Sequence, residues 1–159
     1  ADLPTALNRG ASGIDGLIAT GCGFSAGLKQ PVTLLIGDLS AIHDLNSFKM
    51  IAESEMPVLL VIINNHGGGI FSFLPISEQK EMFENFFSTP HNLNFQAIAE
   101  MFDLEYYRPE SINSFEEEFL NSTQKNKSVV FEIITNSGHN PKQLKEFEKK
   151  LMKHEFRPK

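Results

Sequence analysis

The chain has 159 residues, enough for one domain with a sizeable buried core. Its net charge of −6 argues against nucleic-acid partners, and no apolar run approaches the ~20 residues that span a bilayer. A single cysteine, Cys22, excludes an internal disulfide framework, so we expect a cytoplasmic protein. We expect residues 1–159 to form a single domain and, because the chain opens on Ala1 rather than Met, to belong to a longer protein.

The first 16 residues are rich in Gly, Asn, Asp and Ser, and we expect a loop there. A glycine-containing helix is expected from Leu17 until Lys29-Gln30-Pro31 ends it. Each glycine weakens a helix by about 1 kcal/mol relative to alanine, so we expect this helix to pack closely on a sheet or a ligand. Cys22 lies among its small apolar residues, which favours a buried and unreactive thiol.

Two short apolar runs, at 32–36 and 58–63, predict buried strands because they are β-branched and lack alternation with polar residues. Between them, an apolar spacing close to 3.6 predicts a helix over 41–53, with Ser40 or Asp44 as its cap. A strand–helix–strand unit of this kind implies that the two strands pair in parallel.

The second half of the chain continues to alternate helices with strands. Helices are expected over 77–87, 94–102, 114–122 and 141–155, and strands over 104–107 and 128–134. Ser114 and Glu117 have the spacing of a capping box. Four strands that alternate with helices predict an α/β fold, which we expect to be a three-layer, doubly wound and mostly parallel sheet with helices on both faces.

Polar residues follow both of the predicted parallel strands. Asp38 comes after the first strand, and Asn64-Asn65 come after the second. Carboxyl ends of parallel strands form the ligand-binding edge of an open sheet, so these oxygens suit Mg²⁺ carrying substrate phosphates. Amides of Gly37 and Ser40, at the next helix start, suit phosphate oxygens. The alternative is that Asp38 caps a helix and the two asparagines form a turn.

Arg9 lies in a glycine-rich loop and is well shaped to grip a carboxylate with both guanidinium nitrogens. An ordinary surface arginine is the alternative at this position. The glycines at 21, 23 and 27 have the wrong spacing for a dinucleotide-binding turn, and no lysine is placed for a phosphate-cradling loop.

Gly37-Asp38 followed by Asn64-Asn65 resembles the cofactor-binding motif of thiamine-diphosphate (ThDP) dependent enzymes. The resemblance implies that Asp38, Asn65 and the backbone carbonyl of Gly67 hold Mg²⁺ or Mn²⁺, which in turn holds the diphosphate. Leu39 stands where the general motif has glycine. This departure narrows the match to one branch of the family.

That branch is the 2-succinyl-5-enolpyruvyl-6-hydroxy-3-cyclohexene-1-carboxylate synthases of menaquinone biosynthesis. Three blocks of the chain are similar to it, in order: Asn8-Arg9-Gly10-Ala11-Ser12-Gly13-Ile14-Asp15-Gly16, Gly37-Asp38-Leu39-Ser40 and Asn64-Asn65-x-Gly67-Gly68-x-Ile70-Phe71-Ser72-x-Leu74-Pro75. The resemblance implies decarboxylation of 2-oxoglutarate on ThDP and Stetter-like 1,4-addition of the succinyl carbanion equivalent to isochorismate.

The resemblance also implies roles for individual residues. Ile14 would be the apolar wedge that bends the cofactor, and Arg9 would bind a substrate carboxylate. The substrate pocket would be walled by Ile70, Phe71 and Leu74. Further contacts to the cofactor would come from Ser12, Gly37, Leu39, Ser40 and Ile70.

In these enzymes a glutamate from the pyrimidine-binding domain of a partner subunit activates the cofactor. The resemblance therefore makes residues 1–159 the C-terminal, diphosphate-binding domain of a homodimer or homotetramer. We expect the chain alone to be catalytically silent and to bind ThDP weakly, and residues 66–76 to be partly mobile without cofactor.

Two alternatives stay open. The chain could be the same domain of a 2-oxoacid decarboxylase or an acetohydroxyacid-synthase relative, against which Leu39 and residues 8–16 argue. It could instead be a non-enzymatic α/β module that binds nucleotides or phosphates.

Overall fold

The computed structural model describes residues 4–8, 13–136, 138 and 140–153. The chain divides into two compact units, which are described separately. Unit 1 comprises Ala1–Ile63 and Phe95–Ile133, and unit 2 comprises Asn64–Asn94 and Ile134–Lys159. The expectation of a single domain over residues 1–159 stays a prediction.

Unit 1 is built on a four-stranded sheet with the strand order β1-β2-β4-β3. The strands are β1 (Val32–Gly37), β2 (Val58–Asn64), β3 (Glu105–Tyr107) and β4 (Val129–Ile134). β1 pairs in parallel with β2, and β3 pairs in parallel with β4. All four predicted strands are therefore confirmed, as is the parallel strand–helix–strand unit.

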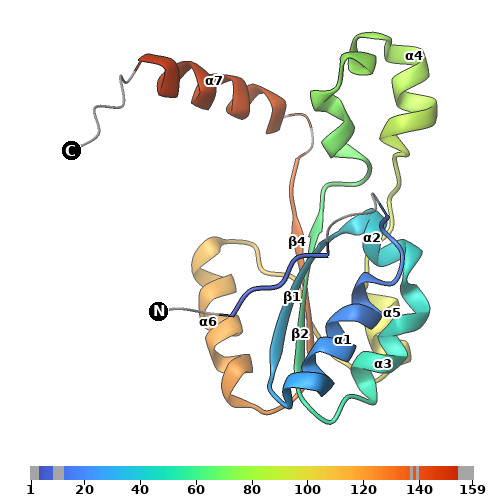
Figure 1. Ribbon diagram of the computed structural model, residues 1–159, viewed down its shortest axis with the longest axis vertical. Helices are drawn as coiled ribbons and strands as arrows, with labels where there is room; N and C mark the ends of the chain where they lie inside the picture. The colour runs from blue at the N-terminus through green and yellow to red at the C-terminus, as the bar shows by residue number, and fades with distance from the viewer. Residues whose placement is uncertain (1–3, 9–12, 137, 139, 154–159) are drawn as a thin grey trace. The chain divides into compact units, whose positions relative to one another are not determined.

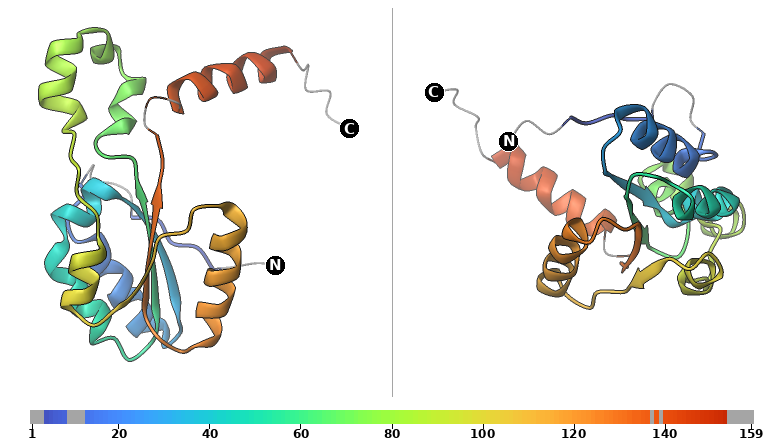
Figure 2. Two further views of the ribbon diagram at one scale, coloured as in Figure 1. Left: turned by 180° about the vertical axis from the view of Figure 1, so that it is seen from behind. Right: turned by 90° about the horizontal axis from the view of Figure 1, so that it is seen from below.

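Helices cover both faces of this sheet (Figures 1 and 2). One face carries α1 (Leu17–Leu28), α2 (Asp38–His43), α3 (Phe48–Ala52) and α5 (Gln96–Met101). The other face carries α6 (Ile112–Gln124), whose aromatic side chains pack on β4. The predicted three-layer α/β architecture is confirmed.

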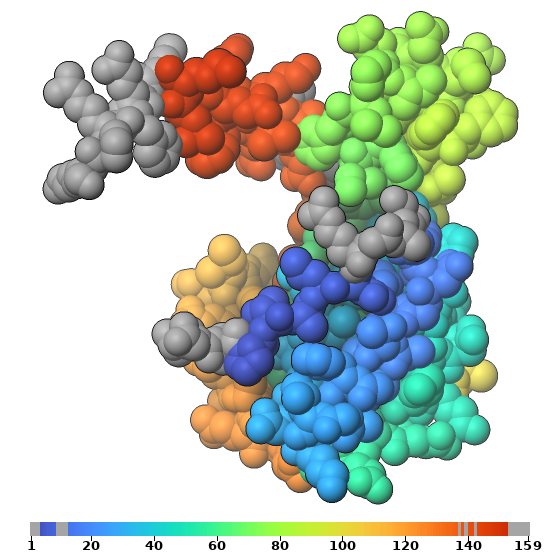
Figure 3. Space-filling view, viewed as in Figure 1, coloured from blue at the N-terminus to red at the C-terminus, as the bar shows by residue number. Residues whose placement is uncertain are grey.

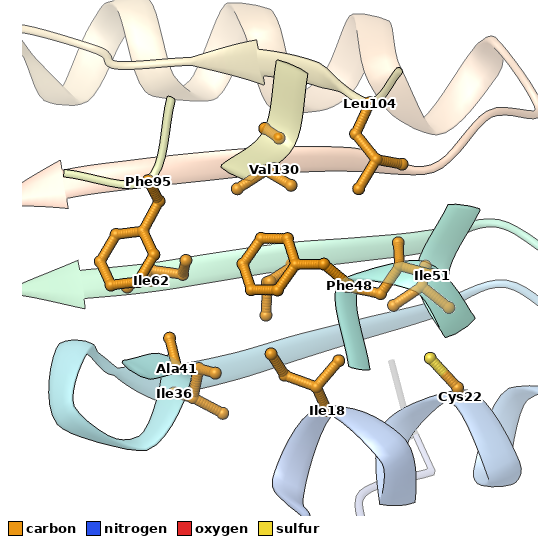
Figure 4. Close-up of a cluster of buried hydrophobic side chains, with 13 residues drawn as sticks. Ile18, Cys22, Ile36, Ala41, Phe48, Ile51, Ile62, Phe95, Leu104 and Val130 are labelled. Atoms are coloured by element: carbon orange, nitrogen blue, oxygen red, sulfur yellow. The ribbon is translucent and has the colours of Figure 1, made fainter. Parts of the chain in front are cut away.

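The larger core lies between the sheet and α1, α2, α3 and α5 (Figure 4). Ile18 and Cys22 of α1 and Phe48 of α3 point at apolar side chains of the strands. Gly21 shows why α1 tolerates glycine, since a Cβ there would lie 2.8 Å from a methyl carbon of Leu34. The predicted close packing of this helix on the sheet is confirmed.

The smaller core, on the opposite face, is centred on Phe131 of β4. Its ring stacks on Tyr107 at 5.5 Å between centroids, and Phe115 of α6 meets it edge-on at 5.6 Å. Aromatic pairs at these separations add about 0.5–1.5 kcal/mol beyond their buried area. They hold α6 to the sheet.

The helix predicted over 41–53 is wrong as one continuous element. The chain forms α2, then a 3₁₀ turn at Leu45–Ser47, then α3. Asp44 accounts for the break, because its buried carboxylate accepts hydrogen bonds from the backbone amides of Ile18 at 2.7 Å and Ala19 at 3.2 Å. Asp44 thus caps α1, whose own N-cap residue, Gly16, has no side chain. Neither Ser40 nor Asp44 caps the start of α2.

A second cap also differs from expectation. α6 begins at Ile112, and its capping box joins Ser111 to Ser114 rather than Ser114 to Glu117. A serine hydroxyl at the third helical position bonds back to the cap in the way a glutamate would. The helix therefore starts two residues earlier than its apolar pattern indicates.

Glu132 of β4 is a charged residue in the interior of unit 1. Its carboxylate accepts hydrogen bonds from the backbone amide of Phe95, at 3.0 Å, and from the hydroxyl of Tyr106. Burial raises the pKa of the Tyr106 phenol, and the hydrogen bond to Glu132 and its charge raise it further. The buried carboxylate of Glu132 is thus paired with donors of its own unit.

Unit 2 contains short helical segments and one longer helix. They are η2 (Gly69–Phe73), η3 (Pro75–Glu78), α4 (Lys80–Phe83), the π-helical η4 (Glu84–Ser88) and α7 (Asn140–Lys153). The helix predicted over 77–87 is therefore divided among three helical types. The amphipathic helix predicted over 141–155 is confirmed as α7 through Lys153, and its last two residues lie outside the described residues.

Among the helices that the structure describes, the longest, α7, has 14 residues. None of them combines the length and apolar character that a membrane crossing requires.

We predict that Asp44→Ala destabilises the protein by about 1–3 kcal/mol, because it leaves buried backbone amides of α1 without an acceptor. Asp44→Asn retains a carbonyl oxygen and is expected to lose less. Urea denaturation of both variants measures the difference. Equal stability of the alanine variant and the unsubstituted protein would contradict the capping role.

Candidate functional site

The two polar segments predicted to bind the cofactor leave the sheet from neighbouring strands. β1 and β2 pair in register, with Gly37 opposite Ile63. Asp38 follows β1 directly, and Asn65 follows the last residue of β2. Parallel pairing thus gives both segments their starting points at the carboxyl ends of adjacent strands, where open α/β sheets bind ligands.

Asp38 opens α2 and is a buried carboxylate, with 3% of its surface exposed. One carboxylate oxygen accepts a hydrogen bond from the amide of Leu39 at 2.8 Å. This contact fits the alternative of a local cap.

Gly37, just before it, has an extended backbone with φ −82° and ψ 163°, which any residue adopts. A Cβ built on Gly37 would meet no atom within 4 Å. Neither backbone conformation nor crowding within the described chain requires glycine here, so the position has room for a ligand to approach the backbone.

The turn after β2 carries the predicted ligand Asn65. Its side-chain oxygen Oδ1 is buried and has no hydrogen-bond partner among the described residues. Nδ1 of His66 is likewise buried with no hydrogen-bond partner among the described residues. Buried polar atoms are nearly always paired, so an unpaired carboxamide oxygen here fits a cation ligand.

The two glycines that follow are required by close packing within unit 2. A Cβ on Gly67 would overlap the carbonyl oxygen of Ser88, and one on Gly68 would overlap that of Phe87. Gly67 also has φ +145°, which other residues rarely adopt. The glycine-rich turn therefore serves the packing of its own unit. The Gly67 carbonyl accepts a hydrogen bond from the amide of Gly69 at 2.9 Å.

The predicted pocket wall lies on one short segment of unit 2. Ile70 and Phe71 belong to η2, and Leu74 follows it directly. Exposed fractions are 72%, 37% and 46% for Ile70, Phe71 and Leu74. Phe71 meets Phe87 edge-on at 6.0 Å between ring centroids. The space-filling view shows this green segment at the surface (Figure 3).

The remaining predicted residues lie in or before unit 1. Ile14 is partly exposed and precedes α1, and Leu39 and Ser40 are half-buried on α2. Arg9 and Ser12 lie outside the described residues.

Burial raises the pKa of the Cys22 thiol, and the nearby charge of Asp44 raises it further. The expected burial of this thiol is confirmed, and its raised pKa disfavours the reactive thiolate.

Two further polar residues lie at strand ends: Asn64, which the sequence pairs with the predicted ligand Asn65, and Thr135, which sequence reasoning missed. Asn64 is fully buried, and its backbone carbonyl accepts the amide of Thr135 at 2.8 Å. Oγ1 of Thr135 is buried with no hydrogen-bond partner among the described residues. Thr135 follows β4 directly, so the strand-end rule that selected Asp38 and Asn65 also finds it.

The family of thiamine pyrophosphate enzymes, C-terminal TPP binding domain, matches residues 5–133. Thiamine pyrophosphate is another name for ThDP. The chain belongs to this family. The match includes Asp38, Asn65 and Gly67, so the parallel sheet described above is the core of a ThDP-binding domain.

Several similar curated proteins carry the same enzyme name. The 2-succinyl-5-enolpyruvyl-6-hydroxy-3-cyclohexene-1-carboxylate synthase of Chlorobaculum parvum is 47% identical over 87% of this chain and 24% of its own length. That of Chlorobium limicola is 43% identical over 86% of this chain and 23% of its own length. The chain thus spans less than a quarter of these relatives.

A solved structure shares the fold at low identity. Benzoylformate decarboxylase from Polynucleobacter necessarius superposes with a TM-score of 0.63 at 17% identity, over 76% of this chain and 23% of that one. At this identity the likeness concerns the fold, and it agrees with the α/β ThDP-binding architecture.

We predict that Gly67→Ala destabilises the protein by about 2 kcal/mol or more, because alanine is strained at this φ and its Cβ meets the Ser88 carbonyl. Gly23→Ala is the matched control. Gly23 lies in α1 with no atom within 4 Å of a built Cβ, so this change should stabilise by about 0.5–1 kcal/mol. Urea denaturation compares the two, and similar effects of both changes would contradict the packing role of Gly67.

Proposed function

We propose that the chain is the diphosphate- and metal-anchoring domain of a ThDP-dependent synthase. This enzyme decarboxylates 2-oxoglutarate and adds the succinyl unit to isochorismate in menaquinone biosynthesis. The observation that carries the proposal is the similarity to synthases of that name, at 43–47% identity over 86–87% of the chain. Leu39 and the block at residues 8–16 point to the same branch.

Asp38, Asn65 and the Gly67 carbonyl would hold Mg²⁺, or Mn²⁺ in its place. The unpaired Oδ1 of Asn65 and the buried carboxylate of Asp38 support this assignment, since both offer the oxygen ligands that these cations prefer. The cation would hold the diphosphate next to Gly37, where a Cβ would otherwise occupy open space. The amides of Gly37 and Ser40 would receive phosphate oxygens, and Ser12, Leu39 and Ile70 would add contacts to the cofactor.

Bound ThDP supplies the electron sink for decarboxylation and carbon–carbon bond formation. The side chain of Ile14 would orient the cofactor by contact with its apolar surface, and Arg9 would bind a substrate carboxylate through two parallel hydrogen bonds. Ile70, Phe71 and Leu74 would exclude water from the reacting carboxylate. An apolar wall disfavours a charged ground state and so favours loss of CO₂.

The glutamate that activates the cofactor would come from a pyrimidine-binding domain of a partner subunit. The short span of the chain relative to its relatives supports this division, because most of each relative's length lies outside the match. The full enzyme would be a cytoplasmic homodimer or homotetramer.

Calorimetric titration of the chain with ThDP and with ADP, each with Mg²⁺, tests the proposal. We expect weak binding of ThDP, because this domain would form only one side of the cofactor pocket. We also expect ThDP to bind more tightly than ADP, because the pocket would be specific for the cofactor. A preference for ADP would instead support a nucleotide-binding module and would remove the ThDP assignment.

We predict that Asp38→Asn in the full enzyme abolishes Mg²⁺-dependent binding of ThDP, because the neutral carboxamide removes the one charged ligand. Asp103→Asn, the same change at an exposed residue with positive φ that asparagine tolerates, is the control and should bind normally. Retained affinity in the Asp38 variant would remove Asp38 from the ligand set.

We predict that residues 1–159 alone do not turn over 2-oxoglutarate and isochorismate, because no pyrimidine-domain glutamate is present to activate the cofactor. Product formation is followed with Mg²⁺ and ThDP in excess, with the full enzyme as the positive control. Turnover by the isolated chain would contradict the assigned division of labour.

A further inference from the structure

The turn that carries Asn65 and Gly67, residues 64–68, is hydrogen-bonded to a second segment of unit 2, residues 88–93. The Asn64 side chain donates to the Leu93 carbonyl at 3.0 Å, His91 donates its amide to the His66 carbonyl at 3.3 Å, and Gly68 donates its amide to the Ser88 carbonyl at 2.7 Å. The order of these pairs shows that the two segments run in opposite directions.

The side chain of Asn64 bonds to both segments. Its Nδ2 donates to Leu93, and its Oδ1 accepts the backbone amide of His66 at 3.0 Å. The Asn64 side chain is fully buried, so its own polar atoms depend on these partners for hydrogen bonds. Its backbone carbonyl is bonded to Thr135 as well.

The turn needs such support because its backbone is unfavourable by itself. His66 has φ +62° and Gly67 has φ +145°. A left-handed conformation at a residue other than glycine costs of the order of 1 kcal/mol and persists only where the surroundings impose it. An asparagine side chain that accepts the amide two residues ahead stabilises a local turn of this kind. Asn65 lies between the two bonded residues, Asn64 and His66.

We propose that Asn64 is a positioning residue for the metal site. Its side chain fixes the backbone on either side of Asn65, so that the Asn65 Oδ1 and the Gly67 carbonyl are held in place before the cation binds. The inference rests on the proposed function, in which these two oxygens are ligands. Preorganised ligands bind a cation more tightly because less ordering remains to be done on binding.

A purely structural role would have a different consequence. If Asn64 only stabilised the fold, its loss would lower the melting temperature and leave the metal affinity of the folded protein unchanged. A positioning role lowers the affinity for Mg²⁺ in protein that is still folded, and saturating Mg²⁺ restores the rate.

The test compares Asn64→Ala with Tyr106→Phe in the full enzyme. The control removes one buried hydrogen bond, to Glu132 in unit 1, and touches no residue of the turn. Mg²⁺ is titrated calorimetrically in the presence of excess ThDP, and melting temperatures are recorded for each protein. The KM for 2-oxoglutarate and kcat are then measured at saturating Mg²⁺.

We expect Asn64→Ala to raise the Kd for Mg²⁺ at least tenfold, with KM for 2-oxoglutarate within twofold of normal and kcat recovered at high Mg²⁺. Tyr106→Phe should lower the melting temperature and leave the Kd for Mg²⁺ unchanged. The inference is overturned if the Asn64 variant melts earlier but binds Mg²⁺ normally, or if both variants lose affinity equally.

Amide hydrogen exchange of the unsubstituted enzyme keeps the inference testable if the alanine variant does not fold. The amides of His66 and Gly68 should gain at least tenfold protection when Mg²⁺ and ThDP are added, and no gain would overturn the positioning role. An unsubstituted enzyme that binds no ThDP with Mg²⁺ would remove the proposed function, and the positioning role with it. If the unsubstituted enzyme and the Asn64→Ala variant both bind Mg²⁺ and ThDP normally, only the positioning role is removed.

Discussion

Parallel pairing of β1 with β2 is the constraint on which the candidate site depends. The two strands run in the same direction, so their carboxyl ends release Asp38 and Asn64-Asn65 from neighbouring positions of one sheet. The pairing is stabilised by burial of β2, whose side chains face a core on each side of the sheet. A one-residue shift of this register would exchange the faces of every side chain in a strand, and both cores oppose it.

The glycines of the chain have two different physical explanations. Gly21, Gly67 and Gly68 face atoms of their own unit, so glycine is required there by packing within the protein. Gly37 faces open space in an extended conformation, and nothing described in the chain accounts for it. Packing within unit 2 therefore explains Gly67 and Gly68, the more conspicuous glycines in the sequence, but it does not explain Gly37.

The strands and the layer order could be predicted because they depend on local apolar runs and on the rules of parallel connection. The break in the helix predicted over 41–53 could not. Asp44 caps a helix about 25 residues earlier in the chain, and an apolar pattern holds no information about so distant a partner. The cap at Ser111 could not be predicted for a simpler reason. Its partner at the third helical position, Ser114, is a serine rather than the glutamate usual in a capping box. The motif identified Asp38 and Asn65, but only hydrogen bonding distinguishes a satisfied oxygen from an unsatisfied one.

That distinction separates the two adjacent asparagines. Asn64 uses both ends of its carboxamide within unit 2, whereas the Oδ1 of its neighbour Asn65 is buried without a partner in the described chain. A buried oxygen left in this way costs about 1–3 kcal/mol, which the fold must offset elsewhere. Offsetting such a cost is reasonable where the oxygen has a ligand to bind, and the bonds of Asn64 keep that oxygen at a fixed place in the turn. The pair therefore combines one residue that shapes the turn with one that is available to a cation, and neither could replace the other.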